Sequence, residues 1–443
     1  MSHRSVTCRK SAHGAGVDSR GVTEVTDRQR SEALPKGVQG AADPNFACAV
    51  RAFAAMFPHP RFGGGALAVY LDGEPVVDVW TGWSDRRGRV HWSEDTGAMV
   101  FSATKGVAAT VIHRLADRGL IDYDAPIAEY WTDFGANGKA DITVREMLRH
   151  RSGLAHLNGV RKSELLDHRL MEERIAAAPV SRQRGKPAYH ALTYGWLVSG
   201  LARAVTGKGM RQLIREEVAE PLNTDGLHLG RPGPDSPTRA AQIIHPQLNF
   251  PNPFFNIIAP RAAVHPLTAG FGALYFPGMK AVVQGNVPLL DSEVPAANGV
   301  ATARGLARMY GALANGGRMN GTQFLSRELT AGLVGRPDLT PDRSVGMPLS
   351  FHLGYHGLPI PGVLPGFGHV GLGGSLGWAI PDSGVAIGFV HNRLLTPFVM
   401  TDQAGFVGTA ALIRAGVARA RRGGFEPIRE FGAPFAVSKS IAG

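Results

Sequence analysis

Cysteine is scarce in this sequence, since Cys8 and Cys48 are the only two among 443 residues. Two cysteines cannot form a disulfide framework, and neither belongs to a Cys-x-x-Cys pair or to a Cys/His spacing typical of zinc. No run of 18 or more apolar residues occurs, so no membrane-spanning helix is predicted. The first twenty residues carry charge but lack the apolar core of an export signal. We therefore expect a cytoplasmic protein that holds no metal ion and no other cofactor.

Acidic residues are fewer than basic ones, and the formal net charge is +11. Residues 1–40 carry seven basic and four acidic side chains, and residues 411–443 carry six and two, so these end segments hold seven of the eleven excess charges. The middle of the chain has no basic stripe and no basic motif interleaved with aromatic residues. Nucleic acid is therefore not an expected partner.

Internal repeats and low-complexity tracts are also missing, whereas glycine (57 residues) and proline (30 residues) are abundant. This composition predicts many turns and loops rather than a helical repeat. We expect a flexible N-terminal arm over residues 1–40, a folded domain over 41–425 and a C-terminal tail over 426–443. The oligomeric state is left open.

Strand patterns lie at both ends of the predicted domain. Near its start, two runs of strand-forming residues flank Asp72-Gly73, a strong hairpin signal. Near its end, residues 368–393 indicate two or three antiparallel strands with a turn at 382–384. Helical periodicity occurs at residues 44–57, 104–119, 143–154, 192–207, 302–317 and 402–422.

These patterns predict an α/β protein of the α+β type. Its antiparallel sheet is built from both chain ends and flanked by helices, and a helix-rich subdomain is inserted over roughly residues 120–290. The strands do not alternate with helices, which argues against a doubly wound parallel sheet.

Two serines are candidate nucleophiles, and the first is Ser375 in the sequence GGSLG. A G-x-S-x-G nucleophile elbow needs a strand, a sharp turn at the serine and then a helix. Here the serine lies in a glycine-rich strand region, and Pro381 and the following turn leave no room for a helix. The pattern therefore disfavours Ser375.

The second candidate is Ser102, which precedes Lys105 in the only S-x-x-K of the sequence. It stands at the start of a predicted helix whose apolar positions are 107, 108, 111, 112 and 115. Residues three apart on a helix share a face, so the hydroxyl and the amine can meet. Serine is also a favoured helix N-cap, which is the alternative structural role.

A lysine that accepts a proton from serine near pH 7 needs a pKa roughly three pH units below ~10.4, at a cost of about 4 kcal/mol. A helix N-terminus supplies only about 0.3–2 kcal/mol of this. The remainder requires burial or a second group that shares the proton. A tyrosine is therefore expected nearby, and Tyr189, in a short loop before a predicted helix, is better placed than Tyr194 within the apolar pattern.

Three short motifs resemble those of penicillin-binding/β-lactamase-like serine hydrolases, and among them the family VIII carboxylesterases related to class C β-lactamases. They are S-x-x-K at residues 102–105, Tyr-His-Ala at 189–191 and His-Val-Gly at 369–371. The segments ITVREMLRHRSGL, ANGVATARGLARMYGALANGG and FGHVGLGGSLGWAIPD also resemble sequences of this family. The likeness runs from about residue 41 to about 425 and implies a β-lactamase-like fold.

The resemblance also implies roles for the motif residues. Ser102 would be acylated, and Lys105 and Tyr189 would form the proton-transfer pair, with the identity of the formal base left open. The backbone N–H groups of Ser102 and Leu372 would form the oxyanion hole. Carboxylic esters, including lipid esters, are the substrates expected of a serine carboxylesterase or lipase of this kind.

The third motif would contact the substrate through His369, Gly371 and Gly373. His369 is expected either to steady Tyr189 or the leaving group, or to be a histidine hydrogen-bonded in the pocket wall. Ala191 and His369 replace the asparagine and lysine with which lactamases and peptidases grip their substrates, so ester hydrolysis is favoured. A β-lactamase or D-Ala-D-Ala peptidase and a catalytically silent binding homologue are the alternatives.

Residues 249–278 combine many aromatic and aliphatic side chains with several prolines and few charges. This segment is expected to wall an acyl-chain pocket or to form an apolar lip that contacts lipid peripherally. A long loop packed on the core is the alternative interpretation.

Overall fold

The computed structural model describes residues 34–161, 163–244, 288–358, 364–394 and 399–435. Segment 249–278, for which an acyl pocket wall or a lipid-contacting lip was expected, lies outside the described residues. Among the helices that are described, none combines the length and the apolar composition that crossing a membrane requires.

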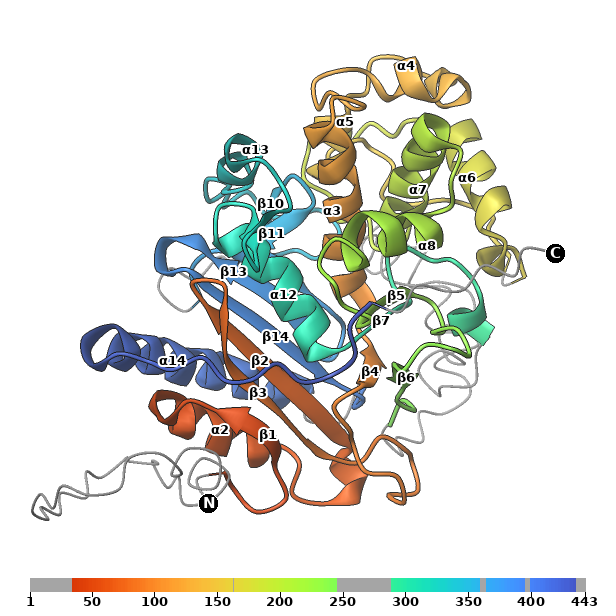
Figure 1. The fold of residues 1–443 in the computed structure, drawn as a ribbon. Helices are drawn as coiled ribbons and strands as arrows, with labels where there is room; N and C mark the ends of the chain where they lie inside the picture. Colours follow the sequence, from red (N-terminus) through yellow and green to blue (C-terminus); the bar gives the residue numbers. More distant parts are fainter. Residues whose placement is uncertain (1–33, 162, 245–287, 359–363, 395–398, 436–443) are drawn as a thin grey trace, which may run out of the picture.

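The centre of the structure is an antiparallel sheet of eight strands in the order β1-β3-β2-β14-β13-β12-β11-β10. Strands from the two ends of the chain meet where β2 pairs with β14 (Figure 1). The α/β fold class with an antiparallel sheet built from both chain ends is thus confirmed. The strands are β1 (Gln39–Ala42), β2 (Gly64–Leu71), β3 (Glu74–Gly82), β10 (Ser350–His352), β11 (Tyr355–Gly357), β12 (Phe367–Val370), β13 (Leu376–Ile380) and β14 (Val385–His391).

The hairpin between β2 and β3 turns at Asp72 and Gly73, as the sequence predicts. Both residues have positive φ, 53° and 85°, which is the conformation of a type I′ turn. Aspartate and glycine tolerate this region better than other residues, so local chemistry selects the turn. At the other end, Gly384 adopts the left-handed conformation before β14.

Both faces of the sheet are covered, so nearly every sheet residue is buried. Along β2, Leu67, Val69 and Leu71 pack on one side of the sheet, whereas Tyr70 and its even-numbered neighbours pack on the other. This is the alternation that a strand imposes. The first side is covered by α2 (Ala47–Ala54) and α14 (Val399–Gly423), and the second by α12 (Ala303–Ala314) (Figure 1).

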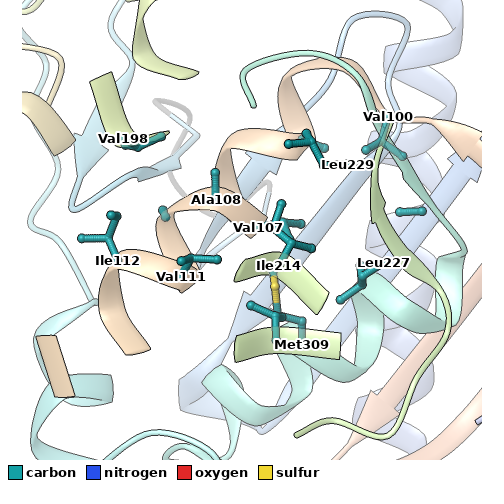
Figure 2. Packing of buried hydrophobic residues seen from close by; sticks show 14 of the residues in the cluster. Val100, Val107, Ala108, Val111, Ile112, Val198, Ile214, Leu227, Leu229 and Met309 are labelled. Atoms are coloured by element: carbon teal, nitrogen blue, oxygen red, sulfur yellow. The ribbon is translucent and has the colours of Figure 1, made fainter. Parts of the chain in front are cut away.

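Most of the remaining helices gather beside the sheet around α3 (Thr104–Asp117) (Figure 1). Val107 of α3, Ile214 and Met309 belong to one buried cluster (Figure 2). The helices are α4 (Ile127–Tyr130), α5 (Val144–Leu148), α6 (His168–Ala177), α7 (Thr193–Thr206), α8 (Met210–Leu213) and α13 (Arg327–Gly332), with a π-helical turn at Ile214–Ala219. Short helical turns occur at Pro44–Phe46, Pro60–Phe62, Phe101–Ala103, Thr132–Gly135, Glu164–Leu166, Pro288–Asp291 and Pro381–Ser383.

Within the described residues, two small sheets accompany the central one. One contains β4 (Thr96–Met99), β5 (Leu227–Leu229), β6 (Arg239–Ala240) and β7 (Gly299–Ala301), and the other pairs β8 (Arg318–Met319) with β9 (Thr322–Gln323). The first small sheet bears on the site, because β4 leads directly into the turn at residues 101–103 and the N–H of Val100 donates to the carbonyl of Gly299.

Residues 426–435, the start of the expected C-terminal tail, pack along the domain surface. The N–H of Ile428 donates to the carbonyl of Pro75 at 2.9 Å. Phe431 contacts Trp80 edge-on, with ring centroids 5.4 Å apart. These contacts give this part of the tail a fixed place against β3.

Candidate active site

Ser102 lies in the short helical turn Phe101–Ala103, immediately before α3. Phe101 has a φ of 47°, a left-handed conformation that costs a residue with a side chain on the order of 1–3 kcal/mol. The turn is held by the hydroxyl of Thr104, which donates to the carbonyl of Phe101 at 2.6 Å and accepts from the N–H of Gly299 at 2.9 Å. The packing around α3 therefore maintains a strained backbone that presents Ser102 half-buried.

Lys105 follows on the first turn of α3 and is completely buried. Its Nζ lies 3.1 Å from Oγ of Ser102 and donates to the carbonyl oxygen of Ala296 at 2.9 Å. No acidic side chain in the described part of the chain forms an ion pair with this amine. Burial lowers the pKa of Lys105 well below its ordinary value. Burial therefore favours the neutral form of the amine.

Tyr189 reaches the same hydroxyl from the loop before α7. Its phenol donates a hydrogen bond to Oγ of Ser102 at 2.8 Å. The ring stacks on Phe351 with centroids 5.5 Å apart and planes 5° apart, and Nζ of Lys105 lies 4.9 Å from the Tyr189 ring centroid. Burial raises the pKa of Tyr189, and the hydrogen bond with Ser102 opposes this in part. Burial thus favours the neutral amine of Lys105 and the protonated phenol of Tyr189.

The other candidate serine has a different environment. Ser375 is buried between β12 and β13, and its Oγ accepts the N–H of His391 at 3.2 Å. No lysine, tyrosine or histidine side chain in the described part of the chain forms a hydrogen bond with this Oγ. Its hydroxyl satisfies a backbone group of the sheet, which is a structural role.

The end of β12 lies directly against the segment that precedes Ser102. A Cβ at Gly371 would lie 2.0 Å from the carbonyl oxygen of Val100, so only glycine permits this approach. The backbone N–H groups of Ser102 and Leu372 donate to no protein acceptor within the described residues. Gly373 has a φ of 92° and continues the tight turn after the motif. Both N–H groups are thus available, and both residues, Ser102 and Leu372, line the cavity described below.

His369 lines the site but forms no hydrogen bond with Tyr189. The two ring centroids are 6.4 Å apart. Nδ1 of His369 lies 3.1 Å from the carbonyl oxygen of Val370, while the buried Nε2 has no partner within the described residues. Burial lowers its pKa well below the ordinary value, so the imidazole is neutral. The neutral ring lacks the charge with which a lysine would grip a carboxylate.

A cavity of about 400 Å³ opens in front of Ser102. Its polar lining side chains are those of Ser102, Tyr189, His356 and His369. None of its described lining residues is Asp, Glu, Lys or Arg. The other side chains of the lining are apolar: Val345, Leu349, Phe351, Leu358, Leu364, Val370, Leu372, Leu376, Phe406 and Val407. A pocket of this size and character suits an uncharged, largely apolar group.

Several residues of the site have no signature in the local sequence. Phe351 supports the Tyr189 ring, and His356 accepts the N–H of Val370 at 3.1 Å. Both lie on the outer strands β10 and β11, far from the motifs in sequence. His150 differs from these two, because the phrase HRSGL that contains it already resembles the family; its ring lies 5.2 Å from that of Tyr189. Within the described residues, no group of three His, Cys, Asp or Glu side chains is arranged to hold a metal ion.

Buried histidines make the fold sensitive to acid. Burial lowers the pKa of His356 to about 4 and that of His113 to about 3, against about 6.5 in an unfolded chain. As the pH falls through this window, the unfolded state takes up protons first. The contribution of these histidines to stability is therefore complete above about pH 6.5 and is lost as the pH falls toward their folded-state pKa values. Within this window, each such histidine lowers the free energy of unfolding by up to about 1.4 kcal/mol per pH unit.

We therefore expect the free energy of unfolding, measured by urea titration, to fall by several kcal/mol between pH 6.5 and pH 4.5. His113 lies in α3 and outside the cavity lining. His113→Gln should reduce the slope of the free energy of unfolding against pH by the equivalent of about one proton. A slope that is unchanged in the variant would contradict a neutral, buried His113.

Known proteins resemble this chain in sequence and in architecture. The chain matches the family described as Beta-lactamase over residues 49–411. It is 62% identical over 429 residues to Esterase/beta-lactamase LipL of Mycobacterium tuberculosis, a match that covers 97% of this chain and 99% of that protein.

Solved structures agree with the sequence comparison. A family VIII carboxylesterase superposes with a TM-score of 0.72 at 30% identity and covers 85% of this chain and 99% of its own. A penicillin-binding protein homolog from Caulobacter crescentus superposes with a TM-score of 0.70 at 28% identity, covering 84% and 99%. The family match spans most of the chain and nearly all of the described site, and it confirms the resemblance carried by the three motifs. This chain belongs to the beta-lactamase family.

Proposed function

We propose that the protein is a serine carboxylesterase that hydrolyses carboxylic esters through an acyl-enzyme on Ser102. The observation that carries this proposal is the convergence on one Oγ of an amine at 3.1 Å and a phenol at 2.8 Å. A buried neutral amine is a competent base, and a protonated phenol is a competent acid. This assignment makes Lys105 the formal base.

The reaction then follows from the positions of these groups. Oγ of Ser102 attacks the ester carbonyl carbon while its proton passes to Nζ of Lys105. The electron pair of the carbonyl moves to oxygen, where the N–H groups of Ser102 and Leu372 stabilise the charge. The bond to the alcohol breaks, and the leaving oxygen takes a proton relayed from Lys105 through Tyr189. Water repeats the sequence on the acyl-enzyme, which releases the carboxylic acid and restores the hydroxyl.

The cavity supports esters with uncharged acyl groups. It offers no cationic side chain among its described lining residues, and burying an unpaired carboxylate costs several kcal/mol. Ala191 and His369 do not supply the amide and ammonium groups that a β-lactam or D-Ala peptide would need. Lipid esters fall within the apolar class, and lipase action and peripheral lipid contact are part of this proposal.

A matched pair of substrates tests the proposal. p-Nitrophenyl butyrate and p-nitrophenyl hemisuccinate have acyl groups of similar length, but only the second carries a carboxylate. We expect kcat/KM to be at least about 30-fold higher for the butyrate, which corresponds to about 2 kcal/mol. Equal values for the two esters would contradict the apolar pocket.

Nitrocefin tests the second candidate function, β-lactam hydrolysis, which is favoured by the name of the relative LipL, an esterase/beta-lactamase. We expect its kcat/KM to be more than about 100-fold below that of the butyrate ester. Faster turnover of nitrocefin than of the ester would establish the lactamase instead. No labelling by a fluorophosphonate probe would favour a silent homologue.

A further inference from the structure

Tyr189 lies in a loop before α7, outside any helix or strand, yet the backbone around it is held at three consecutive residues. The N–H of Ala188 donates to the carbonyl of His150 at 3.1 Å. The N–H of Tyr189 donates to Oδ1 of Asp342 at 3.0 Å. The N–H of His190 donates to Nδ1 of His150 at 3.0 Å. The central N–H, that of Tyr189 itself, depends on a carboxylate 153 residues away.

Asp342 is a buried acidic residue that forms no ion pair within the described residues. The residue is 1% exposed. Oδ1 accepts two further backbone N–H groups, from Ser344 at 2.8 Å and Val345 at 3.1 Å. Oδ2 is buried and has no partner within the described residues. A buried carboxylate that has no ion pair and one oxygen without a partner is costly, even where backbone N–H groups donate to the other oxygen. A stability role alone therefore gives a poor account of it.

The same carboxylate joins two parts of the site. Val345, which donates to Oδ1, lines the cavity in front of Ser102. The N–H of Arg343 donates to the carbonyl of Pro187 at 2.9 Å, which ties the two loops together a second time. Asp342 therefore fixes the distance between the cavity wall and the backbone of Tyr189. Burial, and after it the charge of Asp342, raise the pKa of the Tyr189 phenol.

We propose that Asp342 is a positioning residue for the reaction, because its carboxylate anchors the backbone of Tyr189 and thereby sets the phenol against Oγ of Ser102. This inference rests on the proposed esterase function. Asp342 does not line the cavity among the described residues and acts through Tyr189. A misplacement of about 1 Å in a reacting group is enough to cost about 100-fold in rate.

The test compares Asp342→Ala, Asp342→Asn and the control Asp338→Asn. Asp338 belongs to the same segment, pairs with Arg151 at 2.7 Å and lies outside the cavity lining. Hydrolysis of p-nitrophenyl butyrate is measured per active site, with sites counted by fluorophosphonate labelling. Hydrogen exchange of a peptide containing residues 188–190 is measured on the same samples.

Asp342→Ala should lower kcat per labelled site about 100-fold, change KM less than about threefold and speed exchange at residues 188–190. Asp342→Asn keeps a carbonyl oxygen for the N–H groups and should recover kcat to within about tenfold of wild type. Asp338→Asn should match wild type. If Asp342→Ala does not fold, Asp342→Glu replaces it, because its longer side chain displaces the accepting oxygens.

A variant that keeps wild-type kcat per labelled site, whatever its thermal stability, would overturn the proposal. A kcat per labelled site that is no higher for Asp342→Asn than for Asp342→Ala would also overturn it. The exchange measurement separates this proposal from the proposed function: an inactive, unlabelled wild type refutes the esterase, while unchanged exchange in Asp342→Ala refutes the anchor.

Discussion

Ser102→Ala is expected to lower kcat/KM for p-nitrophenyl butyrate by at least about 10⁴-fold. The hydroxyl that forms the acyl-enzyme is lost, and what remains is the catalysis that N–H donors and binding supply on their own. Fluorophosphonate labelling should disappear with it. The measurement is steady-state hydrolysis at pH 7.5, with folding checked by circular dichroism.

Ser375→Ala is the matched control, since it removes the hydroxyl of the other candidate serine. Ser375 accepts the N–H of His391 inside the sheet, so this variant should lose about 1–3 kcal/mol of stability. Its kcat/KM should stay within about threefold of wild type. If instead Ser375→Ala were inactive and Ser102→Ala active, the assignment of the nucleophile would be wrong.

Lys105→Met is expected to lower kcat by about 10³–10⁴-fold, with little change in KM. Methionine fills most of the space of the buried side chain but cannot accept the proton of Ser102. Because burial lowers the pKa of Lys105 and so favours the neutral amine, wild-type activity should fall as the pH drops below that pKa. This acidic limb should be absent from the residual activity of the variant.

Lys139→Met is the control for the loss of a buried lysine. Lys139 is also buried and donates to the backbone carbonyls of Ala136 and Ala178, but it lines no part of the cavity among the described residues. This variant should be less stable and retain its kcat. Activity of Lys105→Met close to that of wild type would exclude Lys105 as the base.

The fold was predictable because its decisive signals are local. The Asp72-Gly73 turn selects the first hairpin, and the apolar positions of α3, from Val107 onward, are all buried as their spacing indicates. The pairing of β2 with β14 is a long-range contact, and it followed only from the need of both strand patterns to share one sheet.

The candidate site was predictable only in part. Ser102 and Lys105 are one helical turn apart, so their contact is a local property. Tyr189 was inferred because a helix N-terminus alone does not lower the pKa of the lysine enough, so a second group that shares the proton is required. The structure places the Tyr189 phenol against the serine. Asp342 and Phe351 touch Tyr189 across about 150 residues or more of chain, and no spacing rule reports such contacts.

The most direct measurement of the central claim is the intact mass of the protein after brief mixing with an ester, followed by peptide mapping of the modified residue. Detection of one added acyl group on the peptide that contains Ser102, and its absence in Ser102→Ala, is the predicted result. An acyl group mapped to Ser375 or any other residue, or ester turnover with no adduct on Ser102 under conditions that trap the intermediate, would contradict it.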